Sequence, residues 1–301
     1  IRQETFDKFG EVQISDNQAD LPIYFDIRFS NVCNFKCRTC WHGASSKWFE
    51  DAKILGTNLG EKAIIKNITD YEKFIEENGQ HILNAQEIYF AGGEPLVTEE
   101  HYLLLDFLIK NKVNPTLRYN TNLSLLKFKK YDVLEMWSKF SSVEIMASID
   151  GVGELGEYIR SGLNWKQFEE NCLILKNQGH IKLTISPTIS ILNMNHVVDL
   201  IDTCLSKEFV GMNDFYFNIL DRPFYYNVQA IPAEKKEQVT TELNQFLSSK
   251  ADFTVELKMG IESIVNYMNH QQLPEKYWRQ YKEKKVELDE LRGAFFDDNS
   301  N

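Results

Sequence analysis

The fold of this chain is decided by residues 23–40, which read IYFDIRFSNVCNFKCRTC. The first seven of these residues are mostly β-branched or aromatic, so they predict a buried strand over 23–29. Three cysteines, Cys33, Cys37 and Cys40, follow within eight residues in the spacing C-x3-C-x2-C. Thiols grouped this closely after a strand are typical of metal ligands rather than of a disulfide framework. The segment therefore predicts a strand that leads into a metal-binding loop.

Strand-like runs alternate with amphipathic stretches along most of the chain. The predicted strands cover residues 23–29, 87–91, 116–121, 143–149, 182–189 and 214–220. The predicted helices cover residues 70–78, 99–111, 127–140, 165–178 and 195–207. This alternation predicts an α/β fold with parallel strands and right-handed connections, and six units are too few for a closed eight-fold barrel. Pro187 predicts a bend near the end of the fifth strand, because it lacks a backbone N–H.

The pattern changes after residue 220. Predicted helices cover residues 233–250, 261–271 and 274–291, with one short strand at 253–258. The sequence thus predicts three parts: a polar lead-in over 1–20, a core domain over 21–220 and a mainly helical extension over 221–301. Within the core domain, the segment 47–66 is expected to form a helix or lid after the cysteine loop.

Composition limits the class of protein. The 301 residues are 43% hydrophobic and 26% charged, as in an ordinary globular protein. The net charge of −11 argues against nucleic acid as the main partner. No apolar stretch approaches the roughly 20 residues that a membrane helix requires, and no signal peptide is visible, so we expect no membrane partner. The five cysteines suit a reducing cytoplasm, and Cys172 and Cys204 are expected to be small core residues.

A second motif, Gly92-Gly93-Glu94-Pro95, follows the second predicted strand. Ligands in α/β folds gather at the carboxyl ends of the strands. The two glycines let the backbone approach a ligand closely, and Pro95 favours an extended Glu94. The motif therefore predicts a ligand contact, although the same residues can make an ordinary tight turn.

Polar side chains also end the next three predicted strands. Asn120 and Asn122 end the third strand, where they are either ligand contacts or turn residues. Ser148 and Asp150 end the fourth, and strand alternation predicts that both point into the barrel mouth, with helix capping as the alternative for Asp150. Ser186 lies on a hydroxyl-bearing face of the fifth strand.

The cysteine spacing together with the motif at 92–95 resembles the radical S-adenosylmethionine (radical SAM) superfamily, over about residues 21–220. The resemblance implies a partial (β/α)6 barrel in which the three cysteines hold a 4Fe–4S cluster. The fourth iron is then free to bind S-adenosylmethionine (SAM). Thr39 departs from the family, which usually has an aromatic residue before the last cysteine, and Trp41 is expected to cover the cluster instead.

The resemblance also implies a SAM site. Its implied contacts are Gly92, Gly93 and Glu94 for the methionine amino group, Asn122 near SAM and substrate, Ser148 and Asp150 for the ribose, Arg160 for the carboxylate, and Ser186. Arg160 suits its task because a planar guanidinium binds a carboxylate through two hydrogen bonds. The alternative for Arg160 is a surface ion pair with Glu154 or Glu157.

The resemblance further implies an activity: reductive cleavage of SAM to a 5′-deoxyadenosyl radical, which takes a hydrogen atom from a peptide or small-molecule substrate. A one-electron donor such as a flavodoxin or ferredoxin would be a partner. Residues 41–48 resemble the subgroup with a SPASM or twitch extension, whose further cysteines bind more clusters. This chain has no cysteine after Cys204, so the helical extension is expected to be a cluster-free cap.

Two readings of other classes stay open. A cluster-binding electron carrier would need neither Glu94 nor Arg160. A zinc-stabilised α/β scaffold would take His42, two residues after Cys40, as its fourth ligand.

Overall fold

The computed structural model describes residues 22–57, 60–249 and 252–297. Within these ranges, five parallel strands form the central sheet in the order β1-β2-β3-β6-β7. The strands are β1 (Tyr24–Ile27), β2 (Glu87–Phe90), β3 (Thr116–Thr121), β6 (Val143–Ala147) and β7 (Ile181–Ile185). This confirms the predicted α/β fold with parallel strands, and β3 has the predicted bounds. The lead-in over 1–20 lies outside the described residues.

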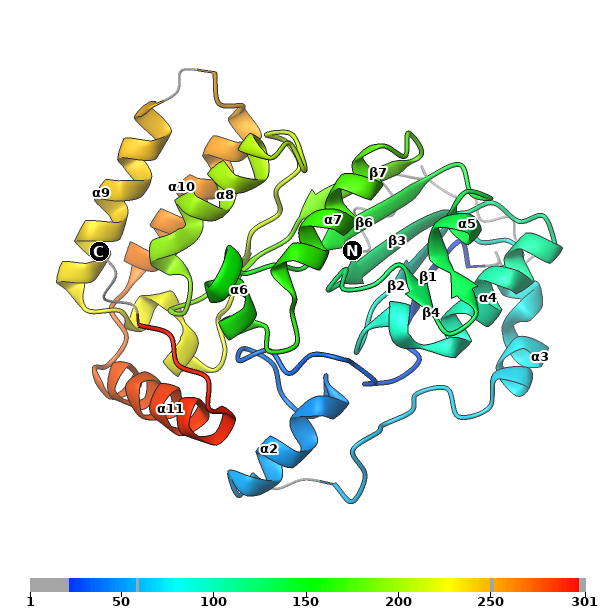
Figure 1. Cartoon of the computed structure of the whole chain (residues 1–301), viewed down its shortest axis with the longest axis horizontal. Helices are drawn as coiled ribbons and strands as arrows, with labels where there is room; N and C mark the ends of the chain where they lie inside the picture. Colours follow the sequence, from blue (N-terminus) through cyan, green and yellow to red (C-terminus); the bar gives the residue numbers. More distant parts are fainter. Residues whose placement is uncertain (1–21, 58–59, 250–251, 298–301) are drawn as a thin grey trace, which may run out of the picture.

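One face of the sheet is apolar and is covered by helices (Figure 1). Ile88, Leu117 and Ile145 lie on this face and are fully buried, together with Leu104 and Leu105 of α4. The connecting helices are α3 (Tyr71–Ile82), α4 (Glu99–Lys110), α5 (Val133–Trp137), α6 (Gly153–Ile159), α7 (Trp165–Lys176) and α8 (Val197–Ser206). Because every second strand residue points to this face, the strands read as alternating rather than uniformly apolar.

The opposite face of the sheet is polar and partly open. Arg118 on β3 forms ion pairs of 2.8 Å with Glu144 on β6 and of 3.4 Å with Glu87 on β2. Asn120 and Met146 lie one step further toward the carboxyl ends of the same strands. These residues line a cavity of about 700 Å³. In a partial barrel this is the inner face, so its polarity provides room for a polar ligand.

The predicted fifth strand is interrupted at Pro187. β7 ends at Ile185, and β8 (Thr188–Ile189) pairs instead with β9 (Asn218–Ile219) in a separate parallel pair. The carbonyl of Pro187 accepts a hydrogen bond of 2.9 Å from the Asn218 N–H, while the ring nitrogen has no hydrogen to donate. The predicted sixth strand over 214–220 is therefore reduced to β9 and a single bridge between Ile185 and Phe215.

Two local predictions were wrong, and one helix was missed. Residues 127–132 form the hairpin of β4 (Lys127–Phe128) and β5 (Tyr131–Asp132) rather than the start of a helix, because Lys129 has a left-handed φ of 53°. The expected strand at 253–258 is not formed: Thr254 caps α10 (Val255–His270), and residues 255–258 are its first turn. α6 was not predicted at all.

The C-terminal helices pack on the end of the barrel. They are α9 (Ala233–Ser249), α10 and α11 (Lys276–Arg292), and they share a second core with residues of α6 and α8, such as Ile159 and Ile201. The helix after the cysteine loop is α2 (Phe49–Ile54), and short 3-10 helices span Ser46–Trp48, Pro95–Val97, Met194–His196, Phe224–Tyr226 and Val228–Ala230. In the ranges described, no helix is both long and apolar enough to cross a membrane.

Candidate functional site

The cysteine loop follows β1 and runs beside the end of α6. The N–H of Lys36 donates to the carbonyl of Ser161 at 2.9 Å, and the N–H of Arg38 donates to that of Ile159 at 2.7 Å. These two hydrogen bonds fix the backbone on both sides of Cys37. All five cysteines of the chain are free thiols; Cys33, Cys37 and Cys40 are partly buried, whereas Cys172 and Cys204 are buried in the core, as predicted.

Burial governs the protonation of the grouped thiols. It raises the pKa of Cys33 to about 11 and that of Cys37 to about 12, and it also raises the pKa of Cys40. The guanidinium of Arg160 opposes this shift, since its Nη1 lies 3.8 Å from Cys37 Sγ. The thiols are therefore protonated at neutral pH without a metal, and metal binding would release protons.

The donor set fits an iron–sulfur cluster in its chemistry. Three thiols from one loop would supply three of the four thiolates that such clusters usually take, and one iron would stay without a protein thiolate. In the described part of the chain, no three His, Cys, Asp or Glu side chains gather closely enough to hold a single metal ion. His42, the ligand that the zinc reading requires, lies edge-on against Trp41, with 5.1 Å between the ring centroids.

Gly93 brings the second motif against the cysteine loop. A Cβ at this position would lie 2.2 Å from the carbonyl oxygen of Val32, and its φ is +51°. The close approach lets the N–H of Glu94 donate to that same carbonyl at 2.8 Å. Only a glycine permits this approach, so Gly93 joins the loop after β2 to the loop after β1.

Glu94 joins these loops to β3. Its side chain is 1% exposed and accepts three hydrogen bonds: from Thr121 Oγ1 at 2.7 Å, from the Asn122 N–H at 2.6 Å and from the Leu96 N–H at 3.1 Å. Burial raises the pKa of Glu94, and these hydrogen bonds oppose the shift. Asn122 in turn donates to Asn34 Oδ1 of the cysteine loop at 2.9 Å. The ends of β1, β2 and β3 thus form one hydrogen-bonded unit.

Asp150 and Arg160 form a buried ion pair. Asp150 Oδ2 lies 2.8 Å from Arg160 Nε, and Oδ1 accepts from Nη2 at 3.0 Å and from the Thr188 N–H at 2.7 Å. The two residues are 1% and 8% exposed. Both alternative readings are therefore wrong: Asp150 does not cap α6, which begins after Val152, and Arg160 is not in a surface pair. The pair places a cation beside Cys37.

The two predicted serines lie differently. β6 ends at Ala147, and the alternation of burial continues through the partly exposed Ser148 and the buried Ile149, but it stops at Asp150, which is buried as well. Ser186 is 4% exposed, and its hydroxyl accepts from Asn218 Nδ2 on β9 at 2.9 Å. Its hydroxyl thus links the interrupted fifth strand to the sixth.

Sequence reasoning missed the hydrogen-bonding roles of three asparagines around the site, of which Asn31 and Asn193 are buried and Asn34 is partly exposed. Asn31 is 4% exposed and donates to the carbonyls of His42 and Ala63. Asn193 donates to the carbonyls of Asp150 and Thr188. Asn34 connects to Asn122, as described above. Asparagine is common in turns, so no sequence signal separates these from ordinary turn residues.

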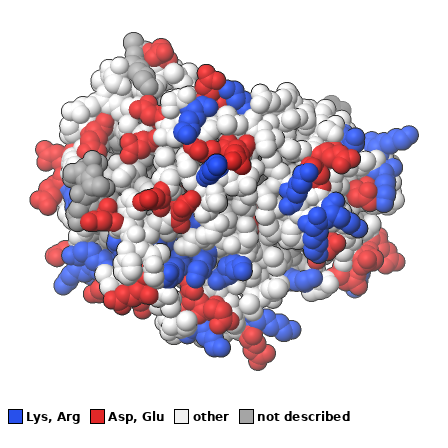
Figure 2. Space-filling model, viewed as in Figure 1, with Lys and Arg blue, Asp and Glu red and all other residues white. Residues whose placement is uncertain are grey.

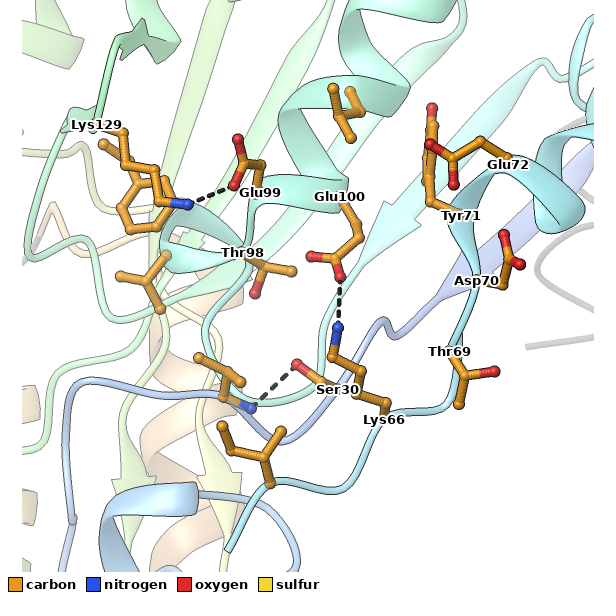
Figure 3. Close-up of a pocket in the computed structure, with 15 residues that line it drawn as sticks. Ser30, Lys66, Thr69, Asp70, Tyr71, Glu72, Thr98, Glu99, Glu100 and Lys129 are labelled. Carbon is orange, nitrogen blue, oxygen red and sulfur yellow. Dashed lines mark hydrogen bonds and ion pairs between the residues drawn. The ribbon is translucent and has the colours of Figure 1, made fainter.

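A second cavity, of about 510 Å³, lies between α3, α4 and the β4–β5 hairpin (Figure 3). Two ion pairs cross it, between Lys66 and Glu100 at 3.2 Å and between Lys129 and Glu99. Over the face seen in Figure 2, acidic and basic side chains are interspersed rather than gathered in a basic stripe.

The chain resembles solved structures of SuiB from Streptococcus suis. The crystal structure of SuiB bound to S-adenosylmethionine matches with a TM-score of 0.50 at 14% identity, over 77% of this chain and 49% of SuiB. SuiB bound to its precursor peptide SuiA matches with a TM-score of 0.48 at 13% identity, over 82% of this chain and 57% of SuiB. The chain thus spans about half the length of SuiB, and the likeness concerns the fold alone.

No curated protein matches the sequence. The sequence model of the Radical SAM superfamily matches residues 27–204, which is more than half of the chain. That range begins in β1, contains the cysteine loop, the Gly92–Glu94 turn and the Asp150–Arg160 pair, and ends in α8. By this match the chain belongs to the radical SAM superfamily, whose members are enzymes that use a 4Fe–4S cluster and S-adenosylmethionine.

Proposed function

We propose that this chain binds a 4Fe–4S cluster and cleaves SAM reductively in order to take a hydrogen atom from a peptide or small-molecule substrate. The observation that carries the proposal is the cysteine loop itself. Its thiols are free, and the loop is bonded to the Gly93 turn and lies beside the buried Arg160. Membership of the superfamily supports the same activity.

The proposed ligands of the cluster are Cys33, Cys37 and Cys40. The proposed contacts of SAM are Gly92, Gly93, Glu94, Asn122, Ser148, Asp150, Arg160 and Ser186. When bound, the reduced cluster supplies the electron that cleaves SAM to methionine and a 5′-deoxyadenosyl radical. The residues of the chain bind and orient the cofactors and exclude water around them.

Arg160 and Glu94 are suited to two different tasks. The guanidinium of Arg160 lies beside Cys37 Sγ, so its charge favours the thiolate that metal binding requires. Asp150 holds the guanidinium in this place through two contacts. Glu94 is buried and takes all its donors from backbone and Thr121, so it fixes the loop geometry and offers a negative charge to an ammonium group.

The substrate is proposed to enter the cavity on the polar face of the sheet. Asn120 supports this, because its side-chain oxygen is buried there without a hydrogen-bond partner among the described residues. A buried polar atom left unpaired favours a ligand that donates a hydrogen bond to it. Arg118 and Lys182 line the same cavity, so a polar substrate fits it better than an apolar one.

The proposed partner and cellular compartment follow from the need of the cluster for an electron and for reduced thiols. We propose a one-electron donor such as a flavodoxin or ferredoxin, and a reducing cytoplasm that keeps the thiols free. Trp41 next to Cys40 is 61% exposed, so it is open to contact with such a donor. The division into a core over 21–220 and a cluster-free helical cap over 221–301 is also proposed.

The test is anaerobic reconstitution with iron and sulfide, followed by SAM and dithionite, with 5′-deoxyadenosine assayed by mass spectrometry. We expect about four irons per chain, and deoxyadenosine that disappears in Cys37→Ala. Cys172→Ala is the matched control, because it removes a thiol that is buried in the core away from the loop. Bound zinc, or a cluster that leaves SAM intact, would instead support a scaffold or an electron carrier.

A further inference from the structure

We propose that the C-terminal helix α11 positions the cysteine loop, and that it acts through Asp289 and Arg292. The inference rests on the proposed function in one respect: Cys37 is taken as a cluster ligand. Asp289 and Arg292 are more than 250 residues from Cys37 in the sequence. In the fold, however, Asp289 contacts Arg38, and Arg292 contacts Asp51, which in turn binds Lys36.

Asp289 binds the residue that follows Cys37. Arg38 is 1% exposed, and its Nη2 forms an ion pair of 2.7 Å with Asp289 Oδ1. The guanidinium lies 3.6 Å from the ring centroid of Tyr158, whose hydroxyl donates to the same Asp289 oxygen at 2.8 Å. Arg38 also donates to the carbonyls of Tyr158 and Ala294. An arginine with this many fixed partners cannot change rotamer alone.

Arg292 reaches the residue that precedes Cys37, through α2. Arg292 Nε lies 2.8 Å from Asp51 Oδ2, and Lys36 Nζ lies 2.9 Å from the other oxygen of Asp51. The side chains of Arg292 and Asp51 are 3% and 8% exposed. Arg292 also donates to the hydroxyl of Ser161, whose carbonyl accepts the Lys36 N–H. Both sides of Cys37 are thus tied to α11.

An apolar contact completes the same helix face. Leu288 packs with Trp48 and Ala52, and Cys40 packs against this group. The indole Nε1 of Trp48 donates to the carbonyl of Cys37 at 2.7 Å, and the guanidinium of Arg292 lies over the Trp48 ring. Arg292 follows Leu288 by four residues and Asp289 by three, so its side chain lies next to both on the surface of α11.

The arrangement has a mechanical consequence for the loop. A buried charge that loses its partner is strongly unfavourable, so undocking of α11 would be costly for the loop: Arg38 would keep only its contacts to Tyr158, and Lys36 only its ion pair with Asp51. Local hydrogen bonds to Ser161 and Ile159 hold the backbone, but they leave the side chains of Lys36 and Arg38 unconstrained. We therefore assign Asp289 and Arg292 as positioning residues that hold Cys37 beside Arg160.

The first experiment uses the full chain without metal, reduced and anaerobic. Each cysteine is alkylated over time, and its rate is followed by peptide mass spectrometry. In Asp289→Asn we expect Cys37 to react about tenfold faster than in the wild type, since one partner of a buried ion pair is lost. Cys172 and Cys204 react only when the core opens, so any rise in their rates measures the loss of global stability, and Cys37 should accelerate by a larger factor than they do. Glu290→Gln is the matched control, an exposed carboxylate one residue further along α11.

Two further variants keep the test decisive. Asp289→Glu should bring the alkylation rate of Cys37 most of the way back to the wild-type value, because it restores the negative charge. If Asp289→Asn had instead unfolded α11 as a whole, a restored charge would not bring the rate back. Arg292→Gln should accelerate Cys37 independently, because it detaches the Lys36–Asp51 pair from α11 while Asp289 still holds Arg38. If the alkylation rates of all five cysteines rise by the same factor, Asp289 serves global stability only and the proposal is overturned.

The second readout is spectroscopic and uses the reconstituted protein. We expect the electron paramagnetic resonance signal and the midpoint potential of the reduced cluster to shift in Asp289→Asn and to return in Asp289→Glu. Unchanged alkylation and unchanged spectra in both variants would overturn the positioning role. If the wild type takes up no cluster, the proposed function fails by itself, while the alkylation rates still decide whether α11 holds the loop.

Discussion

At Gly93, one missing Cβ decides how closely the Glu94 turn approaches the cysteine loop. The position combines a left-handed φ of +51° with a carbonyl oxygen, that of Val32, lying where the side chain would begin. Either condition alone disfavours a side chain, and together they leave glycine as the residue that fits. The loops after β1 and β2 meet at this turn, and Glu94 links them to the loop after β3, so the backbone conformation of Gly93 helps to set the geometry of the site.

We expect Gly93→Ala to lower the free energy of unfolding by about 2 kcal/mol, because the added methyl forces the two loops apart in a strained conformation. Iron uptake on reconstitution should fall with it, since the cysteine loop moves. Urea denaturation and iron analysis measure the two effects. Gly179→Ala is the control, because nothing lies within 4 Å of a Cβ there. Equal stability of the two variants would contradict the argument.

His101 is a second residue whose surroundings set its chemistry. It is fully buried, and its Nε2 lies 2.9 Å from the hydroxyl of Tyr119. Burial lowers the pKa of His101 to about 3. The folded protein therefore keeps the ring neutral where the unfolded chain, with a pKa of about 6.5, already binds a proton.

This difference predicts acid destabilisation with a definite sign. The stability that neutral His101 contributes is present above about pH 6.5 and is lost as the pH falls toward 3, by about 2 kcal/mol at pH 5. Between pH 7 and pH 5, the free energy of unfolding of His101→Gln should fall by about 2 kcal/mol less than that of the wild type, as measured by urea denaturation. His81→Gln, at an exposed position on α3, is the matched control for the substitution itself. If the free energy of unfolding of His101→Gln depends on pH as in the wild type, a group other than His101 causes the acid destabilisation.

At the scale of elements, the sequence predicts best where the signal is local. β3 has the bounds that its alternation predicts, and Pro187 breaks its strand for a reason visible in one residue. The β4–β5 hairpin was missed because its turn residue is Lys129 rather than glycine or asparagine. The Asp150–Arg160 pair was not predicted as a pair, because only tertiary packing brings these side chains together.

Asp132 marks the point where this hairpin gives way to α5. Its side chain accepts from the N–H groups of Leu134 and Glu135, so it caps the helix. We expect Asp132→Ala to cost about 1 kcal/mol of unfolding free energy. Asp132→Asn keeps a capping oxygen and should cost clearly less. Chemical denaturation distinguishes them, and equal losses would assign the effect to the ion pair with Lys127 instead.

At the scale of the whole molecule, two cores are joined rather than separate. The first lies under the central sheet, and the second lies between α6, α8 and the C-terminal helices. Phe215 packs against both, and its bridge to Ile185 continues the sheet between them. The buried pair of Arg38 and Asp289 crosses from the cysteine loop to α11. A substitution that destabilises one core should therefore destabilise the other as well.

We expect Ile261→Ala, a fully buried change in the second core, to lower stability by about 3 kcal/mol. Because the cores are joined, hydrogen exchange should accelerate to the same extent in the most protected amides of α10 and of β6. Exchange followed by mass spectrometry resolves the two elements. Leu173→Ala, at an exposed position on α7, should leave both unchanged. Acceleration confined to α10 would instead mean that the C-terminal helices open on their own, and that the loop beside Cys37 can lose its contacts to α11 while the barrel stays folded.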